Sequence, residues 1–328
     1  MNRIVTLLIA LAALLASAGC QRKDLMEPHN HHNLIIKANF DDHALSQLIS
    51  SKTDGYTKPG EPKTTSYILY EKNSQKVAYR GSFDGLQGGM YVQEGVYDLL
   101  LYTTDFNELD ANFFRGLDKK ETAETHTRQS PLDETRSDDV VEMYMVEPDP
   151  TFSVLQEEIV VFQGQEDKVV EVEFVQKSFK YYLTVKCTGL HNIHSAKMNI
   201  SGMYTSAFLT HEEHRMDESG TQSLDMVITR YPLDSSDTSG VLGKGEVYGE
   251  FWSFGPNQRE NIVNSITLYF LNGGERVIML DDLTSQIKQL TRGGEIIVEQ
   301  VIEIKGPPSG FDPGVGDWDD PTDVEIIL

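Results

Sequence analysis

Apolar and polar residues alternate along many short segments of this chain, and no other pattern restricts its fold as strongly. The alternation is clearest in residues 170–174, 181–187, 266–270 and 296–304, with Gln300 as the one interruption. A period of two is typical of antiparallel strands that turn one face to a core and the other to solvent. Because Gly, Asn, Asp and Ser separate the segments, we predict an all-β fold made of β-sandwiches.

Six further segments have the composition of strands: residues 34–40, 66–71, 75–79, 97–102, 140–146 and 158–162. Helical spacing is rare. Residues 283–290 show it, with aspartates before them and glycines after them, and residues 45–49 fit one or two turns. We therefore predict one or two short helices, neither of which is long enough to build a core.

The N-terminus has the three-part layout of a bacterial export signal. Residues 1–3 carry one positive charge, residues 4–15 form an almost unbroken apolar run, and residues 16–19 are small. The apolar run is about half of the roughly 20 residues that span a bilayer, so a permanent transmembrane helix is not expected. We predict that residues 1–19 are a signal peptide.

The cysteine that follows the small residues indicates a lipid anchor. Small residues directly before Cys20 resemble the lipobox of bacterial lipoproteins, although Ser17 stands where leucine is usual. We predict cleavage between Gly19 and Cys20 and acylation (palmitate included) of Cys20, which would hold the protein at a membrane. Residues 20–33 are polar and aperiodic and read as a flexible tether. The alternative is an ordinary cleaved signal with an incidental cysteine.

The mature chain has the length of two domains. About 300 of the 328 residues remain after the signal. We place an N-terminal β-sandwich at residues 34–177 and a C-terminal one at residues 178–305. Residues 107–139 are rich in charge and threonine and are predicted to be a long exposed loop.

Charge and cysteine content narrow the function further. The net charge of −23 argues against nucleic acid as a partner, because phosphate recognition needs a basic surface. Acylation of Cys20 would leave Cys187 without a disulfide partner in the chain, so stability must come from the cores. Cys187 lies at an apolar position of an alternating segment and is expected to be a small buried hydrophobe.

The end of the chain is an acidic tail that closes on an apolar strand. Residues 306–328 begin with Gly and Pro, which break any preceding strand. Val324, Ile326 and Leu328 share one face of the final strand and are candidates for pairing with a partner. This strand could complete an edge of its own domain or reach another subunit.

No constellation of residues predicts catalysis, a metal or a cofactor. The segment His211-Glu212-Glu213-His214 spaces its histidines by three, whereas a zincin helix needs four, so we expect a solvated loop. The tether histidines His29, His31 and His32 indicate a spacer. The aspartates around Trp318 do not match an EF-hand loop, and we interpret them as linker. We expect the protein not to be an enzyme.

Aromatic residues offer one other function. Phe251, Trp252 and Phe254 lie in a single strand-like run, and such runs usually line a core. An exposed Trp252 or Trp318 could instead stack on sugar rings. A surface lipoprotein that binds a glycan is therefore our alternative hypothesis.

The chain resembles the Bacteroidota fimbrillin-like lipoproteins, in particular the FimB-like fimbrial anchor group and its uncharacterised Bacteroides relatives. The matching segments keep the family's order over nearly the whole chain: Cys20–Leu25, Glu94–Asp105, Tyr182–Lys186, Ser201–Met203, Phe251–Gly255, and the closing strand, short helix and strand at Ile266–Leu271, Leu283–Leu290 and Ile296–Ile304.

This resemblance implies two tandem transthyretin-like β-sandwiches and a place in type V pili, which are fimbria-like assemblies at the cell outer membrane. In that family, a strand from one subunit completes the sheet of its neighbour. An anchor member keeps its lipid, and a shaft member loses it to a protease. Since no early arginine cleavage site stands out, the resemblance favours an anchor or accessory subunit with fimbrillin-like partners.

Overall fold

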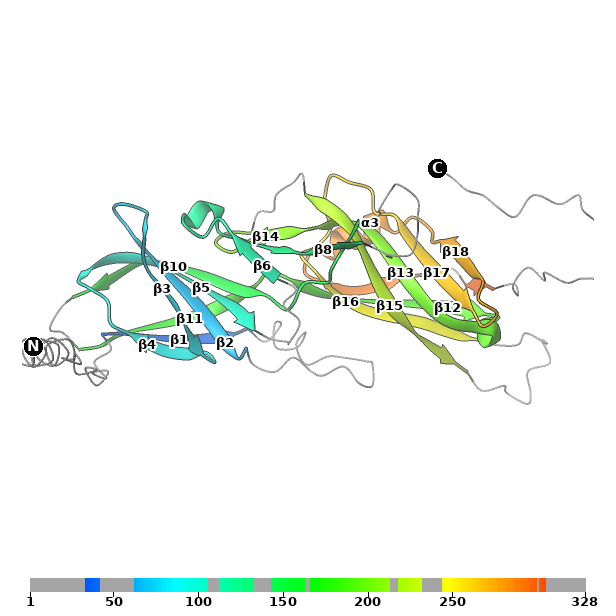
Figure 1. The fold of residues 1–328 in the computed structure, drawn as a ribbon, viewed down its shortest axis with the longest axis horizontal. Coiled ribbons are helices and arrows are strands. Elements are labelled where there is room, and N and C mark those ends of the chain that lie inside the picture. The colour runs from blue at the N-terminus through cyan, green and yellow to red at the C-terminus, as the bar shows by residue number, and fades with distance from the viewer. Residues whose placement is uncertain are drawn as a thin grey trace, which may run out of the picture.

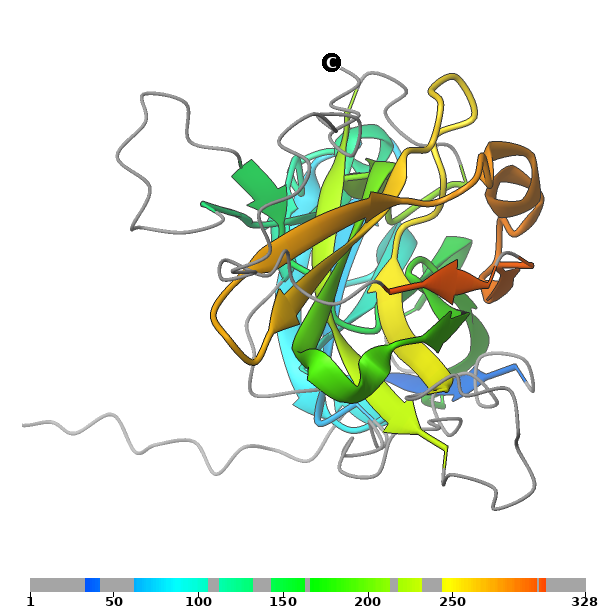
Figure 2. The ribbon, with the colours of Figure 1, turned by 90° about the vertical axis from the view of Figure 1, so that its right-hand side faces the viewer.

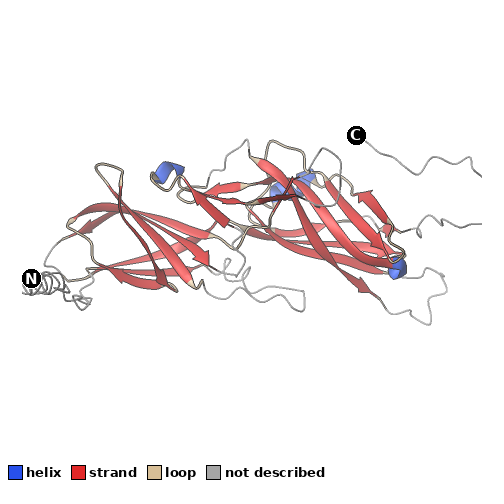
Figure 3. Ribbon diagram, viewed as in Figure 1, coloured by secondary structure: helices blue, strands red, loops and turns tan. Residues whose placement is uncertain are grey.

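The computed structural model describes residues 33–41, 62–105, 112–131, 143–162, 166–212, 218–231, 244–299 and 301–304. These residues form two β-sandwiches that follow each other along the long axis of the molecule (Figure 1). Strands account for nearly all of the regular structure (Figure 3). The predicted all-β fold of tandem sandwiches is therefore confirmed.

The N-terminal sandwich is a seven-stranded sheet curled around one core. Its strands lie in the order β3-β2-β5-β10-β11-β1-β4. They are β1 (Leu34–Phe40), β2 (Thr64–Glu71), β3 (Val77–Asp84), β4 (Gln87–Met90), β5 (Gly95–Asp105), β10 (Phe152–Val161) and β11 (Lys168–Gln176). In β11 the predicted alternation is present, because Val170, Val172 and Phe174 are buried while Glu171 and Glu173 are exposed.

The C-terminal sandwich has two layers joined by one long strand. Its strands are β12 (Phe179–Thr188), β13 (Ile193–Tyr204), β15 (Ser219–Arg230), β16 (Gly245–Ser253), β17 (Asn264–Phe270), β18 (Glu275–Met279), β19 (Gly294–Ile297) and β20 (Ile302–Glu303). The first half of β15 pairs with β13 and its second half pairs with β16. Viewed along the long axis, β17 and β18 (orange) belong to one layer, and β12, β16 and β19 belong to the other (Figure 2).

The core of this sandwich contains Cys187. The cysteine is 3 % exposed, and burial raises the pKa of its thiol to about 11. It is a buried hydrophobe, as predicted from its apolar position. The helix α3 (Thr284–Gln289) lies at the predicted place, and the carboxylate of Asp282 accepts a hydrogen bond from the backbone N–H of Thr284. The second candidate helix, residues 45–49, lies outside the described residues.

The prediction of a loop over residues 107–139 is wrong for the part that the structure describes. Residues 112–131 form β6 (Asn112–Arg115), the turn η1 (Lys120–Thr122), β7 (Glu124–Thr127) and β8 (Gln129–Pro131). Beyond them, β9 (Met143–Met145) pairs with β8 and with β15. β7 also pairs with β14 (Ser206–Phe208) of the C-terminal half.

The polar composition of β7 explains why the sequence does not predict this strand. Glu124, Thr125 and Thr127 are buried although none is apolar. Arg115 compensates the carboxylate of Glu124 with two hydrogen bonds of 3.1 and 3.0 Å and also pairs with Glu218. These contacts tie the segment 112–131 to both halves of the molecule, although its pattern predicts exposure.

Candidate functional site

The predicted lipidation and cleavage residues, Cys20 and Gly19, lie outside the described residues, and so do the candidate partner strand Val324, Ile326 and Leu328. The tether histidines and Trp318 lie outside them too. Within the described part of the chain, no helix is long and apolar enough to cross a membrane. The lipid anchor and the tail strand therefore stay predictions.

The histidine segment contributes packing and backbone contacts. His211 stacks on Phe208 with ring centroids 4.2 Å apart, and its backbone carbonyl accepts a hydrogen bond from Lys177. Glu213 and His214 lie outside the described residues. Among those that are described, no three His, Cys, Asp or Glu side chains gather closely enough to hold a metal ion.

The three aromatic residues at the end of β16 and just after it belong to three different core clusters. Phe251 is 1 % exposed and packs in the C-terminal core, while Trp252, on the opposite face of the strand, packs with the N-terminal core. Phe254 lies with Tyr204 and Ala207 in a small cluster of its own. With 4 % of its surface exposed, Trp252 joins the two sandwiches and offers no face to a sugar.

The first strand, β1, is held along both of its edges. It runs parallel to β11 from the pair Leu34↔Lys168 to the pair Phe40↔Phe174. On its other edge it pairs antiparallel with β4. Leu34 and Ile36 are fully buried, so β1 supplies both backbone hydrogen bonds and core side chains. We call the position between β11 and β4 the β1 slot.

Both ends of β1 are fixed in the slot. At the start, the amide side chain of Asn33 donates to the carbonyl of Val92 at 2.6 Å and accepts the N–H of Val92 at 2.8 Å. At the end, the ring of Phe40 lies 4.7 Å from that of Phe152 and 5.4 Å from that of Phe174. A strand so close to the N-terminus is thus an integral part of the sandwich.

The two sandwiches meet at a buried ion pair that the sequence did not predict. The ammonium of Lys180 lies 3.2 Å from a carboxylate oxygen of Glu250, and the two side chains are 1 % and 2 % exposed. Tyr248 donates to the other oxygen at 2.9 Å. Burial, and next to it the hydrogen bond to Glu250, raise the pKa of Tyr248.

A second carboxylate, that of Glu147, faces the same junction. One of its oxygens accepts the backbone N–H of Trp252 at 2.7 Å. Burial raises the pKa of Glu147 to about 7. The hydrogen bond from Trp252 and the charge of Lys180 lower this pKa, whereas the charges of Glu250 and Asp149 raise it further. The junction therefore holds a carboxyl group that titrates near neutral pH.

This pKa predicts a pH dependence of stability. Since folding raises the pKa of Glu147 from 4.5 to about 7, its contribution is fully present below about pH 4.5 and is lost as the pH rises through 7. The contribution is at most about 3 kcal/mol. Glu147→Gln keeps the hydrogen-bond acceptor, so we expect it to be more stable than the wild type at pH 8 and equal at pH 4.5.

Urea unfolding of both proteins between pH 4.5 and 8 measures this difference. Glu157→Gln, which removes a half-exposed carboxylate away from the junction, is the matched control. Parallel pH profiles of the wild type and Glu147→Gln would contradict the assignment.

A family model matches residues 19–225, which is well over half of the chain; its description is "Domain of unknown function (DUF5119)". The chain belongs to the DUF5119 family. No curated protein matches this DUF5119 chain.

Solved structures are similar to the DUF5119 chain in fold. A candidate adhesin from Bacteroides ovatus has a TM-score of 0.53 at 17 % identity, over 88 % of this chain and 98 % of that one. A candidate adhesin from Bacteroides thetaiotaomicron has a TM-score of 0.44 at 8 % identity, over 75 % and 79 %. The fimbrial anchor protein Mfa2 from Porphyromonas gingivalis has a TM-score of 0.40 at 11 % identity, over 77 % and 82 %.

The first of these similarities shows that the DUF5119 chain shares its fold with that B. ovatus protein over nearly its whole length. Membership of the FimB-like anchor group stays a prediction.

Proposed function

We propose that this protein is a lipoprotein of the outer cell surface that serves as an anchor or accessory subunit of fimbria-like assemblies through β-strand complementation. The fold it shares with a candidate adhesin supports a role at the cell surface. The observation that carries the proposal is the β1 slot, which the protein fills with its own first strand.

A filled β1 slot limits the subunit to one role in an assembly, that of strand donor. In strand complementation, one subunit accepts a strand through main-chain hydrogen bonds and side-chain pockets, and another donates it. With β1 retained, the slot has no room for a neighbour's strand, so the subunit can donate but cannot accept. A subunit of this kind ends a polymer, and a lipid at Cys20 would fix that end to the membrane.

The tail is the proposed donor. Val324, Ile326 and Leu328 have the alternation that an acceptor groove recognises. Pairing within the same molecule is the other arrangement, for which the outer edge of β18 is suited. Among the described strands β18 pairs with β17 alone, and it exposes 57 % of Val277 and 56 % of Met279.

Substitutions in the tail test the donor role in the native bacterium. Changing Val324, Ile326 and Leu328 together to Asp is expected to leave the protein in the membrane fraction but to abolish its recovery with higher-mass assemblies. Ile327→Asp, on the opposite strand face, is the control and should assemble normally. Recovery of assemblies with the triple variant would remove the tail from the mechanism.

The anchor is tested separately. Cys20→Ala should yield a folded protein, judged by an unchanged unfolding midpoint, that leaves the membrane fraction and no longer retains assemblies at the cell. If the released protein still supported surface-attached assemblies, the anchor role would fail. The alternative hypothesis, glycan binding through an exposed Trp252, is not supported, because Trp252 is buried.

A further inference from the structure

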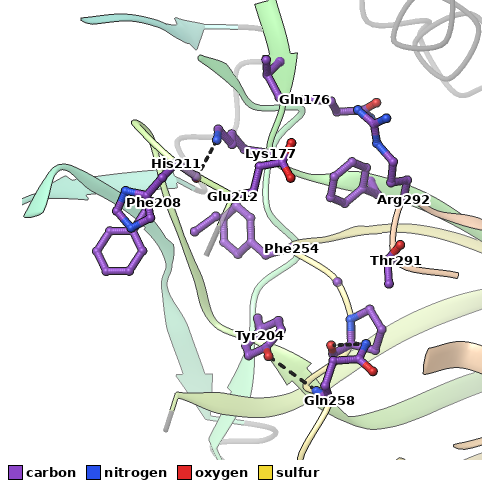
Figure 4. A pocket seen from close by; sticks show the side chains of 15 residues that line it. Gln176, Lys177, Tyr204, Phe208, His211, Glu212, Phe254, Gln258, Thr291 and Arg292 are labelled. Atoms are coloured by element: carbon purple, nitrogen blue, oxygen red, sulfur yellow. Dashed lines mark hydrogen bonds between the residues drawn. The ribbon is translucent and has the colours of Figure 1, made fainter. Parts of the chain in front are cut away.

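A cavity of about 320 Å³ opens where the two sandwiches meet. Its wall comes from the link between β11 and β12, from β14 and the residues after it, and from the turns that follow β16 and α3. Figure 4 shows Lys177 and Arg292 above Phe254, with Tyr204 and Gln258 below. Cavities of this size hold small ligands.

The charged centre of this junction cavity is Lys177. The residue is 7 % exposed, and its ammonium donates to the carbonyl of His211 at 2.8 Å. Among the described residues no carboxylate lies within ion-pair distance of it, although Glu212 is near enough to favour its charge. Burial lowers the pKa of Lys177 to about 8. A buried cation that has no ion-pair partner among the described residues lowers stability, and such charged groups are frequent in binding sites.

The remaining wall combines aromatic faces with groups that form hydrogen bonds. The stacked pair Phe208–His211 is partly exposed and supplies a flat apolar surface, while Phe254 and Tyr204 are buried in the wall behind it. Gln258 and Thr291 supply amide and hydroxyl groups. Aromatic faces pack against the C–H face of a sugar ring, and amides and hydroxyls satisfy its hydroxyls.

The electrostatic balance of the cavity is opposite to that of the chain. Lys177 and Arg292 line it against a single described carboxylate, that of Glu212, whereas the whole protein carries a net charge of −23. Two cations facing one cavity favour a ligand that brings a negative charge and that replaces the water around the ammonium with a charge-assisted hydrogen bond.

We propose that the junction cavity binds an acidic sugar, with the carboxylate of the sugar on Lys177 and Arg292 and its ring against the stacked pair Phe208–His211. The cavity holds one or two rings and is too small for an extended strand, so this site is separate from the β1 slot. The proposal does not depend on strand complementation.

Calorimetry on the purified protein tests the site with D-glucuronate and with glucose, which has the same ring without the carboxylate. We expect glucuronate to bind with a Kd between about 0.1 and 1 mM, and glucose at least about tenfold more weakly. The site is overturned if the two sugars bind equally or if neither binds.

Isocaproate, an apolar carboxylate without a ring, should also bind weakly. Tighter binding of isocaproate than of glucuronate would overturn the assignment to a sugar.

Lys177→Met retains the length of the side chain and removes its charge. We expect it to weaken glucuronate binding at least about tenfold while the unfolding midpoint stays the same or rises, because a buried charge is removed. Lys186→Met, an exposed cation of β12 outside the cavity, is the matched control. Unchanged binding by a folded Lys177→Met protein would overturn the proposal.

A pH profile separates the cation from general packing effects. The titratable side chains that line the cavity are those of Lys177, Tyr204, His211, Glu212 and Arg292. Burial lowers the pKa of Lys177 to about 8, so Lys177 loses its proton between pH 8 and 9.5. Glucuronate affinity should fall over this window in the wild type and stay flat in Lys177→Met. A flat wild-type profile would count against Lys177 as the anion partner.

Discussion

Removing residues 34–40 is expected to abolish the folding of the N-terminal sandwich. The deletion takes away the buried side chains of Leu34 and Ile36, and it leaves the hydrogen-bonding edges of β11 and β4 open. Loss of each large aliphatic side chain from a core costs about 2–5 kcal/mol, so two of them alone approach the 5–15 kcal/mol that stabilises a typical domain. Circular dichroism and urea titration measure the loss.

A synthetic peptide tests whether the β1 slot can take a strand from another molecule. The peptide of residues 33–41, added to the protein that lacks residues 34–40, should restore the cooperative unfolding transition. A peptide with Ile36→Asp is the matched control and should not restore it, because the carboxylate would enter the core. If the deleted protein unfolded with the stability of the wild type, β1 would not be integral to the sandwich. Failure of the wild-type peptide would exclude strand exchange at this slot.

Lys180→Met should destabilise the protein by about 3–5 kcal/mol at pH 7, since it leaves the buried carboxylate of Glu250 without its cation. Glu250→Gln in the same molecule removes that uncompensated charge, and the double variant should regain most of the loss. Urea unfolding of the wild type, the two single variants and the double variant gives the four free energies of unfolding that a double-mutant cycle needs.

The exposed pair Lys197–Asp225, in which the side chains are 41 % and 88 % exposed, provides the contrast. Lys197→Met should change the stability by less than about 1 kcal/mol, since surface ion pairs contribute little. An equally small effect of Lys180→Met would mean that Glu250 is not charged in the folded protein, and the junction would then be held by packing alone.

The strands that the sequence predicts best are those with one apolar face. Residues 34–40 have the composition of a strand, and β1 spans Leu34–Phe40 with Leu34, Ile36 and Ala38 buried on one face. Residues 296–304, predicted as one segment interrupted at Gln300, form β19 and β20, which pair with different parts of β12. Alternation identifies such elements because it reflects the burial of one face.

The contact between the two sandwiches could not be predicted from the alternation of apolar and polar residues. Lys180 and Glu250 occupy the polar face of their strands, where alternation predicts solvent. Alternation shows which side chains share a face but not what covers that face, and here the second sandwich covers it. The same limit applies to β7, whose buried Glu124 is stabilised by Arg115 and not by apolar neighbours. The cavity at Lys177 likewise depends on segments far apart in the sequence.

The placement of β1 also determines how the molecule withstands mechanical load. A pull transmitted through the N-terminus enters the fold at Leu34, whose neighbours across the sheet are Lys168 on one side and Met90 on the other. Along the strand axis, such a pull shears the hydrogen bonds on both edges of β1 at once and does not peel them apart one by one. Forced unfolding is governed by the unfolding rate, so a protein that is pulled through its first strand has a longer lifetime under tension when that strand lies between two others.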